Sequence, residues 1–116
     1  MFADDPETAL PRLRSYFWTT AYLRRVSEAG AFGSVSRRGD PSAGTVFIEV
    51  FHDEGVDLWA PAAGALGRRF DRVLAGAASF EVSERMEREV AFDTDLWLLT
   101  VEDRAGRVFL TADEVG

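Results

Sequence analysis

Two acidic side chains follow the only histidine of the chain. His52 is followed by Asp53 and Glu54, and an imidazole beside carboxylates is a combination used in general acid–base catalysis and in metal binding. These residues suggest a hydrolytic or acid–base enzyme around His52 as one alternative. A metal site with one imidazole needs carboxylates from elsewhere in the chain, and the same three residues are typical of a tight turn. We therefore assign no catalytic residue, metal ligand or cofactor.

A second group with potential chemistry is the run Arg37, Arg38, Gly39 and Asp40. Glycine lets backbone amides turn toward a ligand, and guanidinium groups favour phosphate or carboxylate. The run thus predicts, as another alternative, an anion- or nucleotide-binding module. Adjacent strand residues point to opposite faces, so only one arginine reaches a given spot. We favour a structural interpretation, in which Asp40 accepts hydrogen bonds from the amides of residues 42 and 43 and one arginine pairs with a carboxylate of the same chain.

Large aromatic residues occupy positions where a one-sided sheet would be polar. If Val46, Ile48 and Val50 face the helices, then Phe47 and Phe51 project from the other face. Either the second helix and the middle loops cover this second face, or it is exposed and marks a partner surface. The leading hypothesis is a small non-enzymatic interaction module, with a homodimer as the favoured assembly, since two-fold dimers are the commonest soluble assembly. Its interface candidates are Phe47, Phe51, Trp59 and Trp97.

The elements that must position these residues follow from hydrophobic periodicity. Helical spacing predicts a helix over 15–29 that stops at Gly30, and alternation predicts strands over 32–38, 45–51 and 56–60. A possible edge strand covers 68–74, Ser83 can cap a short helix over 83–92, and two strands flank a turn at Gly106. The expected fold is α+β, with two helices packed on a largely antiparallel sheet of five or six strands. Residues 1–11 are expected to form a loosely ordered leader, and 12–116 a single domain.

Composition restricts the function further. The absence of cysteine excludes disulfides and thiolate chemistry, and no apolar run approaches the ~18 residues of a membrane-spanning helix. The acidic N-terminal stretch has no secretory signal, so we expect a cytoplasmic protein that does not associate with a membrane. All 13 basic residues are arginine and the net charge is -7, which works against binding to nucleic acid.

Several sequence blocks, taken in order, resemble a known family. The blocks are "WTTAYLRR", "GAF", "RRGDPSAGTVFIEV" and "FDTDLWLLTVEDRAGR", and they extend from about Trp18 to about Leu110. They are similar to a family of small alphaproteobacterial proteins catalogued only as a domain of unknown function. The resemblance implies one domain in a bacterial cytoplasm and brings no catalytic residue with it. In the family a proline usually separates the two aspartates of the last block, where this chain has Thr94.

Overall fold

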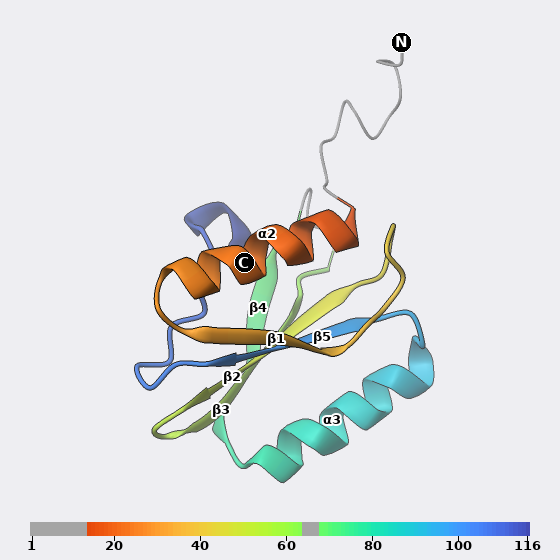
Figure 1. Cartoon of the computed structure of the whole chain (residues 1–116). Helices are drawn as coiled ribbons and strands as arrows, with labels where there is room; N and C mark the ends of the chain where they lie inside the picture. Colours follow the sequence, from red (N-terminus) through yellow and green to blue (C-terminus); the bar gives the residue numbers. More distant parts are fainter. Residues whose placement is uncertain (1–13, 64–67) are drawn as a thin grey trace.

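The computed structural model describes residues 14–63 and 68–116, which form two helices and a five-stranded mixed sheet (Figure 1). The elements are α2 (Ser15–Glu28), β1 (Phe32–Arg37), β2 (Val46–His52), β3 (Gly55–Pro61), β4 (Phe70–Ala77), α3 (Ser79–Phe92), β5 (Trp97–Glu102) and a 3-10 turn, η1 (Ala112–Glu114). The strand order is β1-β5-β2-β3-β4. Among the pairings of these five strands, β2–β5 is parallel and the other three are antiparallel. The expected α+β class is confirmed, whereas the expected leader lies outside the described residues.

Helix α2 covers one face of the sheet. Trp18, Tyr22 and Val26 recur every four residues and are buried, and the rings of Trp18 and Tyr22 stack with their centroids 5.0 Å apart. They meet the strand residues that share the face of Val46, namely Ile48, Val50, Trp97, Leu99 and Val101. The helix ends where the sequence predicts, because Gly30 adopts a φ of +88° just beyond it.

Helix α3 covers the opposite face, so the sheet lies between two helical layers (Figure 1). Its buried residues Val82 and Met86 are one helical turn apart and belong to a second core with Phe47, Val56 and Leu58. This second core explains why both faces of β2 are apolar. No helix among the described residues is long and apolar enough to cross a membrane.

The start of α3 differs from the sequence prediction. The helix begins at Ser79, so Ser83 lies inside it and is not its cap. Glu81 occupies the first turn, where the helix dipole favours an acid, and its carboxylate accepts a hydrogen bond from the Ala78 amide at 3.0 Å. β4 also runs to Ala77, three residues beyond the end of the expected edge strand over 68–74.

The segment after β5 also differs from the prediction. Gly106 has the positive φ (+79°) that the predicted turn requires, but the residues that follow form no strand. β5 already has β1 on one side and β2 on the other, so no edge of β5 is free for a returning strand. The segment runs along α2 instead, where the Tyr22 hydroxyl donates to the Val108 carbonyl at 2.5 Å and Arg25 donates to the Phe109 carbonyl at 2.6 Å.

Candidate binding site

The loop after β1 packs against the first turn of α2. The Asp40 carboxylate accepts hydrogen bonds from the amides of Ser42 and Ala43 at 3.1 and 2.8 Å, which confirms the predicted turn. The amides of Ser15 and Tyr16 donate to carbonyls of the same loop at 3.3 and 2.8 Å. A helix N-terminus attracts anions through such amides. Here loop carbonyls already occupy these two donors.

The same loop also packs against the residues that lead into β5. The Asp40 amide donates to the Asp95 carbonyl at 2.9 Å, and the indole nitrogen of Trp97 donates to the Asp40 carbonyl at 2.8 Å. A Cβ atom added to Gly39 or to Gly44 would overlap the Asp95 carbonyl oxygen. These glycines therefore allow two backbone segments to approach each other, which is a structural role and not the ligand-binding role considered from the sequence.

Neither arginine of the loop makes the expected ion pair with a described residue, so that prediction is wrong. Arg37 donates to the Thr94 carbonyl at 2.8 Å. The Arg38 guanidinium lies over the rings of Tyr16 and Trp97, 5.6 and 5.3 Å from their centroids. A carbonyl and two aromatic faces thus replace the expected carboxylate, and the two guanidinium groups do not converge on one anion site.

Both ring nitrogens of His52 are engaged within the chain. Nδ1 accepts a hydrogen bond from the Glu54 amide at 3.2 Å, so in the neutral ring Nε2 carries the hydrogen and donates to Asp57 at 2.9 Å. A general base needs a nitrogen that can accept a proton from a substrate. His52 offers none in this arrangement, and no cluster of three potential metal ligands occurs in residues 14–63 and 68–116.

Asp57 is the buried centre of this network. Its side chain accepts a hydrogen bond from the Gly76 amide at 2.8 Å and lies 3.6 Å from the Arg72 guanidinium. Burial alone would raise the pKa of Asp57, but the hydrogen bonds from Gly76 and His52 and the charges of His52 and Arg72 outweigh it and lower the pKa. The network joins the β2–β3 hairpin to β4 and is satisfied without a ligand.

The four aromatic interface candidates do not form one surface. Phe47 is buried beneath α3, whereas Trp97 is buried on the α2 side, because the parallel register pairs it with Val46. Trp59 is half-buried on the α2 side with Arg72 5.8 Å from its ring. Only Phe51 is exposed, at 37%. The proposed four-residue patch is therefore wrong, and the covering of the second face by α3 is the main reason.

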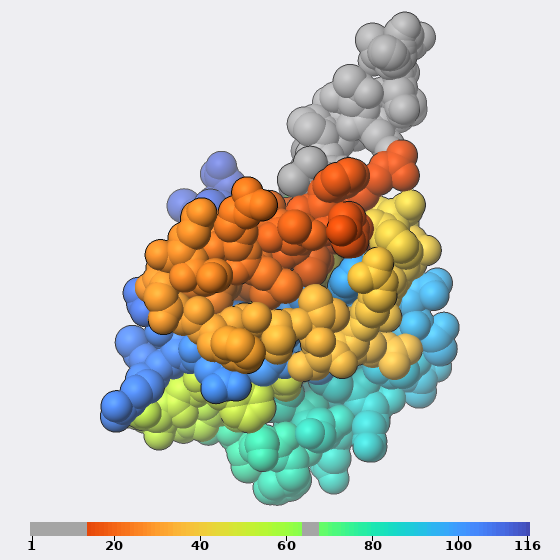
Figure 2. Space-filling view, viewed as in Figure 1, coloured from red at the N-terminus to blue at the C-terminus, as the bar shows by residue number. Residues whose placement is uncertain are grey.

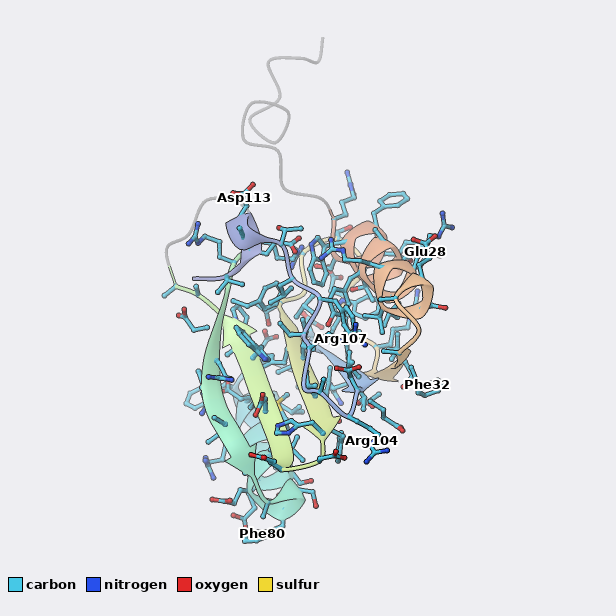
Figure 3. The ribbon with its side chains drawn as sticks, turned by 90° about the vertical axis from the view of Figure 1, so that its left-hand side faces the viewer. Glu28, Phe32, Phe80, Arg104, Arg107 and Asp113 are labelled. Atoms are coloured by element: carbon cyan, nitrogen blue, oxygen red, sulfur yellow. The ribbon has the colours of Figure 1, made fainter. Side chains whose placement is uncertain are left out.

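Helix α3 nevertheless leaves part of its own side of the sheet open. It packs chiefly against β3 and β4, away from the β1 edge. The register aligns Phe32, Glu102 and Phe51 across β1, β5 and β2, and Phe32 is 60% exposed. Figure 3 shows Phe32 projecting from this end of the sheet, well apart from Phe80 on α3. We call this surface the open half-face and define it by Phe32, Ser34, Glu49, Phe51, Leu98, Thr100 and Glu102.

A groove of about 460 Å³ continues the open half-face toward α3. Met86 and Val90 of α3 form one wall, Leu98 of β5 forms the other, and Glu49 and Arg37 supply charge. The groove thus combines apolar walls with a few polar groups, as small binding sites commonly do.

Glu49 is the polar centre of the groove. Its Oε2 accepts a hydrogen bond from the Thr100 hydroxyl at 2.6 Å, and that hydroxyl is also hydrogen-bonded to Ser36. Burial raises the pKa of Glu49, and the hydrogen bond from Thr100 only partly opposes this. No described residue forms an ion pair with Glu49. The groove can therefore accept a cation or a hydrogen-bond donor at this carboxylate.

The comparisons with known proteins identify the family. A family model described as "Protein of unknown function (DUF1491)" matches residues 13–111. The chain belongs to the DUF1491 family. This confirms the resemblance seen in the sequence. No curated protein matches the chain.

Solved DUF1491 structures share this fold. A crystal structure of a DUF1491 family protein from Caulobacter crescentus is 30% identical with a TM-score of 0.77, and the match covers 90% of this chain and 97% of that one. The solution structure of a protein from A. tumefaciens is 34% identical with a TM-score of 0.78, and the match covers 86% and 93% of the two chains. Both sources fit the alphaproteobacterial setting implied by the resemblance.

Glu49 is the residue of this DUF1491 chain that the sequence interpretation missed. Its signal was the position of a lone acid in the otherwise apolar run from Val46 to Phe51. An acid in a strand covered on both faces lowers the stability of the fold unless its carboxylate reaches water or a hydrogen-bond donor. The sequence interpretation left open whether the face of Phe47 and Phe51 is covered or exposed, and on an exposed face Glu49 would simply be solvated.

Proposed function

We propose that the protein is a non-enzymatic interaction module that binds a segment of a partner polypeptide on the open half-face. The main support for the proposal is the exposure of two phenylalanines on this surface. Phe32 and Phe51 are 60% and 37% exposed and lie on either side of Glu102 in adjacent strands. Exposed apolar residues gathered on one surface commonly mark a partner site. A hollow of about 680 Å³ is lined by Phe32 and Phe51 together with charged residues such as Glu102 and Arg104, so it offers both apolar and polar contacts.

The free edge of β1 supports the same location. Among the strands of the described residues β1 pairs with β5 alone, and in Figures 1 and 2 it crosses the front of the molecule. An edge strand offers unpaired backbone groups to an incoming strand. β4, at the other edge, is partly occupied, because Val115 forms a parallel bridge with Phe70. A partner segment therefore has backbone and side-chain contacts available together at β1.

A second copy of the chain is the competing partner. Two β1 strands related by a two-fold axis would join two sheets into one, as the homodimer hypothesis requires. The net charge of -7 on each copy opposes that pairing, whereas it attracts a basic partner. We therefore favour a different polypeptide as the partner. The expected cytoplasmic location remains a prediction.

The test is selection of binding peptides from a random library, followed by titration of the ¹⁵N-labelled protein with a selected peptide. We expect shifts of backbone amide signals in β1 and β5, and an affinity about tenfold weaker for Phe32→Ser. Phe17→Ser is the matched control, because Phe17 is also 60% exposed but lies on α2. Light scattering in parallel reports self-association. Peptides that shift α2 signals, or equal losses for both variants, would contradict the proposal.

A further inference from the structure

We propose that the groove beside the open half-face receives a lysine side chain of the partner, with its ammonium group on Glu49. The inference rests on the proposed function, because it names what the partner segment inserts. The groove lies between α3 and the sheet, and Glu49 and Leu98 belong to both the groove and the open half-face. A segment seated on β1 and β5 therefore passes over the entrance of the groove.

The shape and lining of the groove suit an aliphatic stem that ends in a charge. Met86, Val90 and Leu98 provide apolar walls, and Glu49 provides the carboxylate. A lysine side chain buries its methylene groups along apolar surface while its ammonium reaches a polar group. Glu87 also lines the groove, and its negative charge would attract the ammonium group of the lysine.

Glu49 has one carboxylate oxygen left for a partner. Its Oε2 already accepts the Thr100 hydroxyl at 2.6 Å, and no hydrogen bond to a described residue occupies Oε1. Arginine binds a carboxylate best through two parallel hydrogen bonds, whereas an ammonium needs a single oxygen. The geometry thus favours lysine over arginine.

The cation within the groove does not already neutralise Glu49. Arg37 lines the same groove but donates to the Thr94 carbonyl at 2.8 Å and forms no ion pair with a described residue. The pKa of Glu49, which burial raises, agrees with a carboxylate that lacks a nearby positive charge. An incoming ammonium would lower that pKa.

A second copy of these 116 residues cannot supply the proposed group, because the sequence contains 13 arginines and no lysine. The groove therefore points to a different polypeptide. The net charge of -7 on each copy also opposes self-pairing. A dimer through β1 would not place a lysine in the groove.

The test uses n-butylammonium, which reproduces the lysine side chain, in a titration of the ¹⁵N-labelled protein. We expect saturable shifts at Glu49, Val90 and Leu98, with affinity about fivefold weaker for Glu49→Gln, which retains the acceptor for Thr100. The side-chain analogue of arginine, n-propylguanidinium, and neutral n-butanol should bind more weakly. In ¹³C titrations, n-butylammonium should lower the pKa of Glu49. Equal affinity for n-butanol, equal affinity for Glu49→Gln, or shifts outside the groove would overturn the assignment.

The outcome is separable from that of the proposed function. If n-butylammonium fails to bind while selected peptides still map to β1 and β5, the lysine assignment is overturned and the proposed function stands. If n-butylammonium binds but no peptide maps to the open half-face, the proposed function falls and the assignment to a partner's lysine falls with it. Phe32→Ser should leave n-butylammonium binding unchanged, because Phe32 does not line the groove.

Discussion

The Thr100 hydroxyl donates a hydrogen bond to Glu49 across the β2–β5 pair, at 2.6 Å. This bond gives the carboxylate of the central strand one partner in a partly buried position. It does not compensate fully for burial, since the pKa of Glu49 remains raised. A charged group held at a cost to stability is typical of a site kept for binding.

Glu49→Gln should therefore stabilise the protein at neutral pH. A carboxyl group whose pKa is raised on folding contributes stability below its unfolded pKa and loses that contribution as the pH rises through the folded pKa. We expect a higher urea midpoint for Glu49→Gln at neutral pH, and a smaller gain in acid where Glu49 is protonated. Glu87→Gln, at the same groove, is the control. A lower midpoint for Glu49→Gln at neutral pH would contradict this account.

Asp57 should show the opposite pH dependence. Its pKa is lowered on folding, so its contribution is present above its unfolded pKa and is lost as the pH falls through the folded pKa, below about pH 4. Asp57→Asn should cost about 1–3 kcal/mol at neutral pH, because groups bonded to the buried carboxylate lose an acceptor. It should also reduce the loss of stability between neutral pH and about pH 3.

Urea unfolding at several pH values measures the Asp57 effect. Asp113→Asn is the control, because Asp113 is exposed in η1. If Asp57→Asn unfolds at the same urea concentration as the parent protein at neutral pH, the network of His52, Asp57 and Gly76 is not a structural one. The enzyme hypothesis around His52 would then regain support.

Gly39→Ala and Gly44→Ala should each destabilise the fold by about 1–3 kcal/mol, because the added methyl group overlaps the Asp95 carbonyl and forces the backbone to move. Gly30→Asn is the control. Gly30 has open space around it, and asparagine tolerates its positive φ. Chemical denaturation compares the three variants. Unchanged stability for both alanine variants would show that the loop does not need this close packing.

We expect no binding to DNA or RNA at physiological salt. The net charge is -7, and the Arg37 and Arg38 side chains lie against a carbonyl and two aromatic rings without forming a basic stripe. Fluorescence anisotropy with single- and double-stranded oligonucleotides measures this. Micromolar affinity that weakens steeply with added salt would contradict the prediction.

Local patterns in the sequence predicted the elements that depend on neighbouring residues. The α2 stripe of Trp18, Tyr22 and Val26 and the Asp40 turn appear as expected, because spacing and turn chemistry determine both. The final strand pair was mispredicted, since the pattern after Gly106 does not reveal that β1, distant in sequence, already occupies the edge of β5. Strand order is a property of the whole chain.

The candidate site was harder to predict for the same reason. The sequence placed Phe47 and Phe51 on one face, which is correct, but it could not show that α3 buries Phe47 and leaves Phe51 exposed. Trp97 was named as an interface candidate although its face was undetermined, because only the parallel register with Val46 places it on the α2 side. The sequence did not identify Glu49 as a candidate site residue, because the groove that it lines forms only where α3 packs on the sheet.

Intermolecular nuclear Overhauser effects between a selected peptide and the protein show directly whether the open half-face holds the partner segment. We expect contacts from the peptide to the ring protons of Phe32 and Phe51, on the open half-face. Contacts to Phe17 on α2 or to Phe92 at the end of α3, with none to Phe32 or Phe51, would contradict the proposed function.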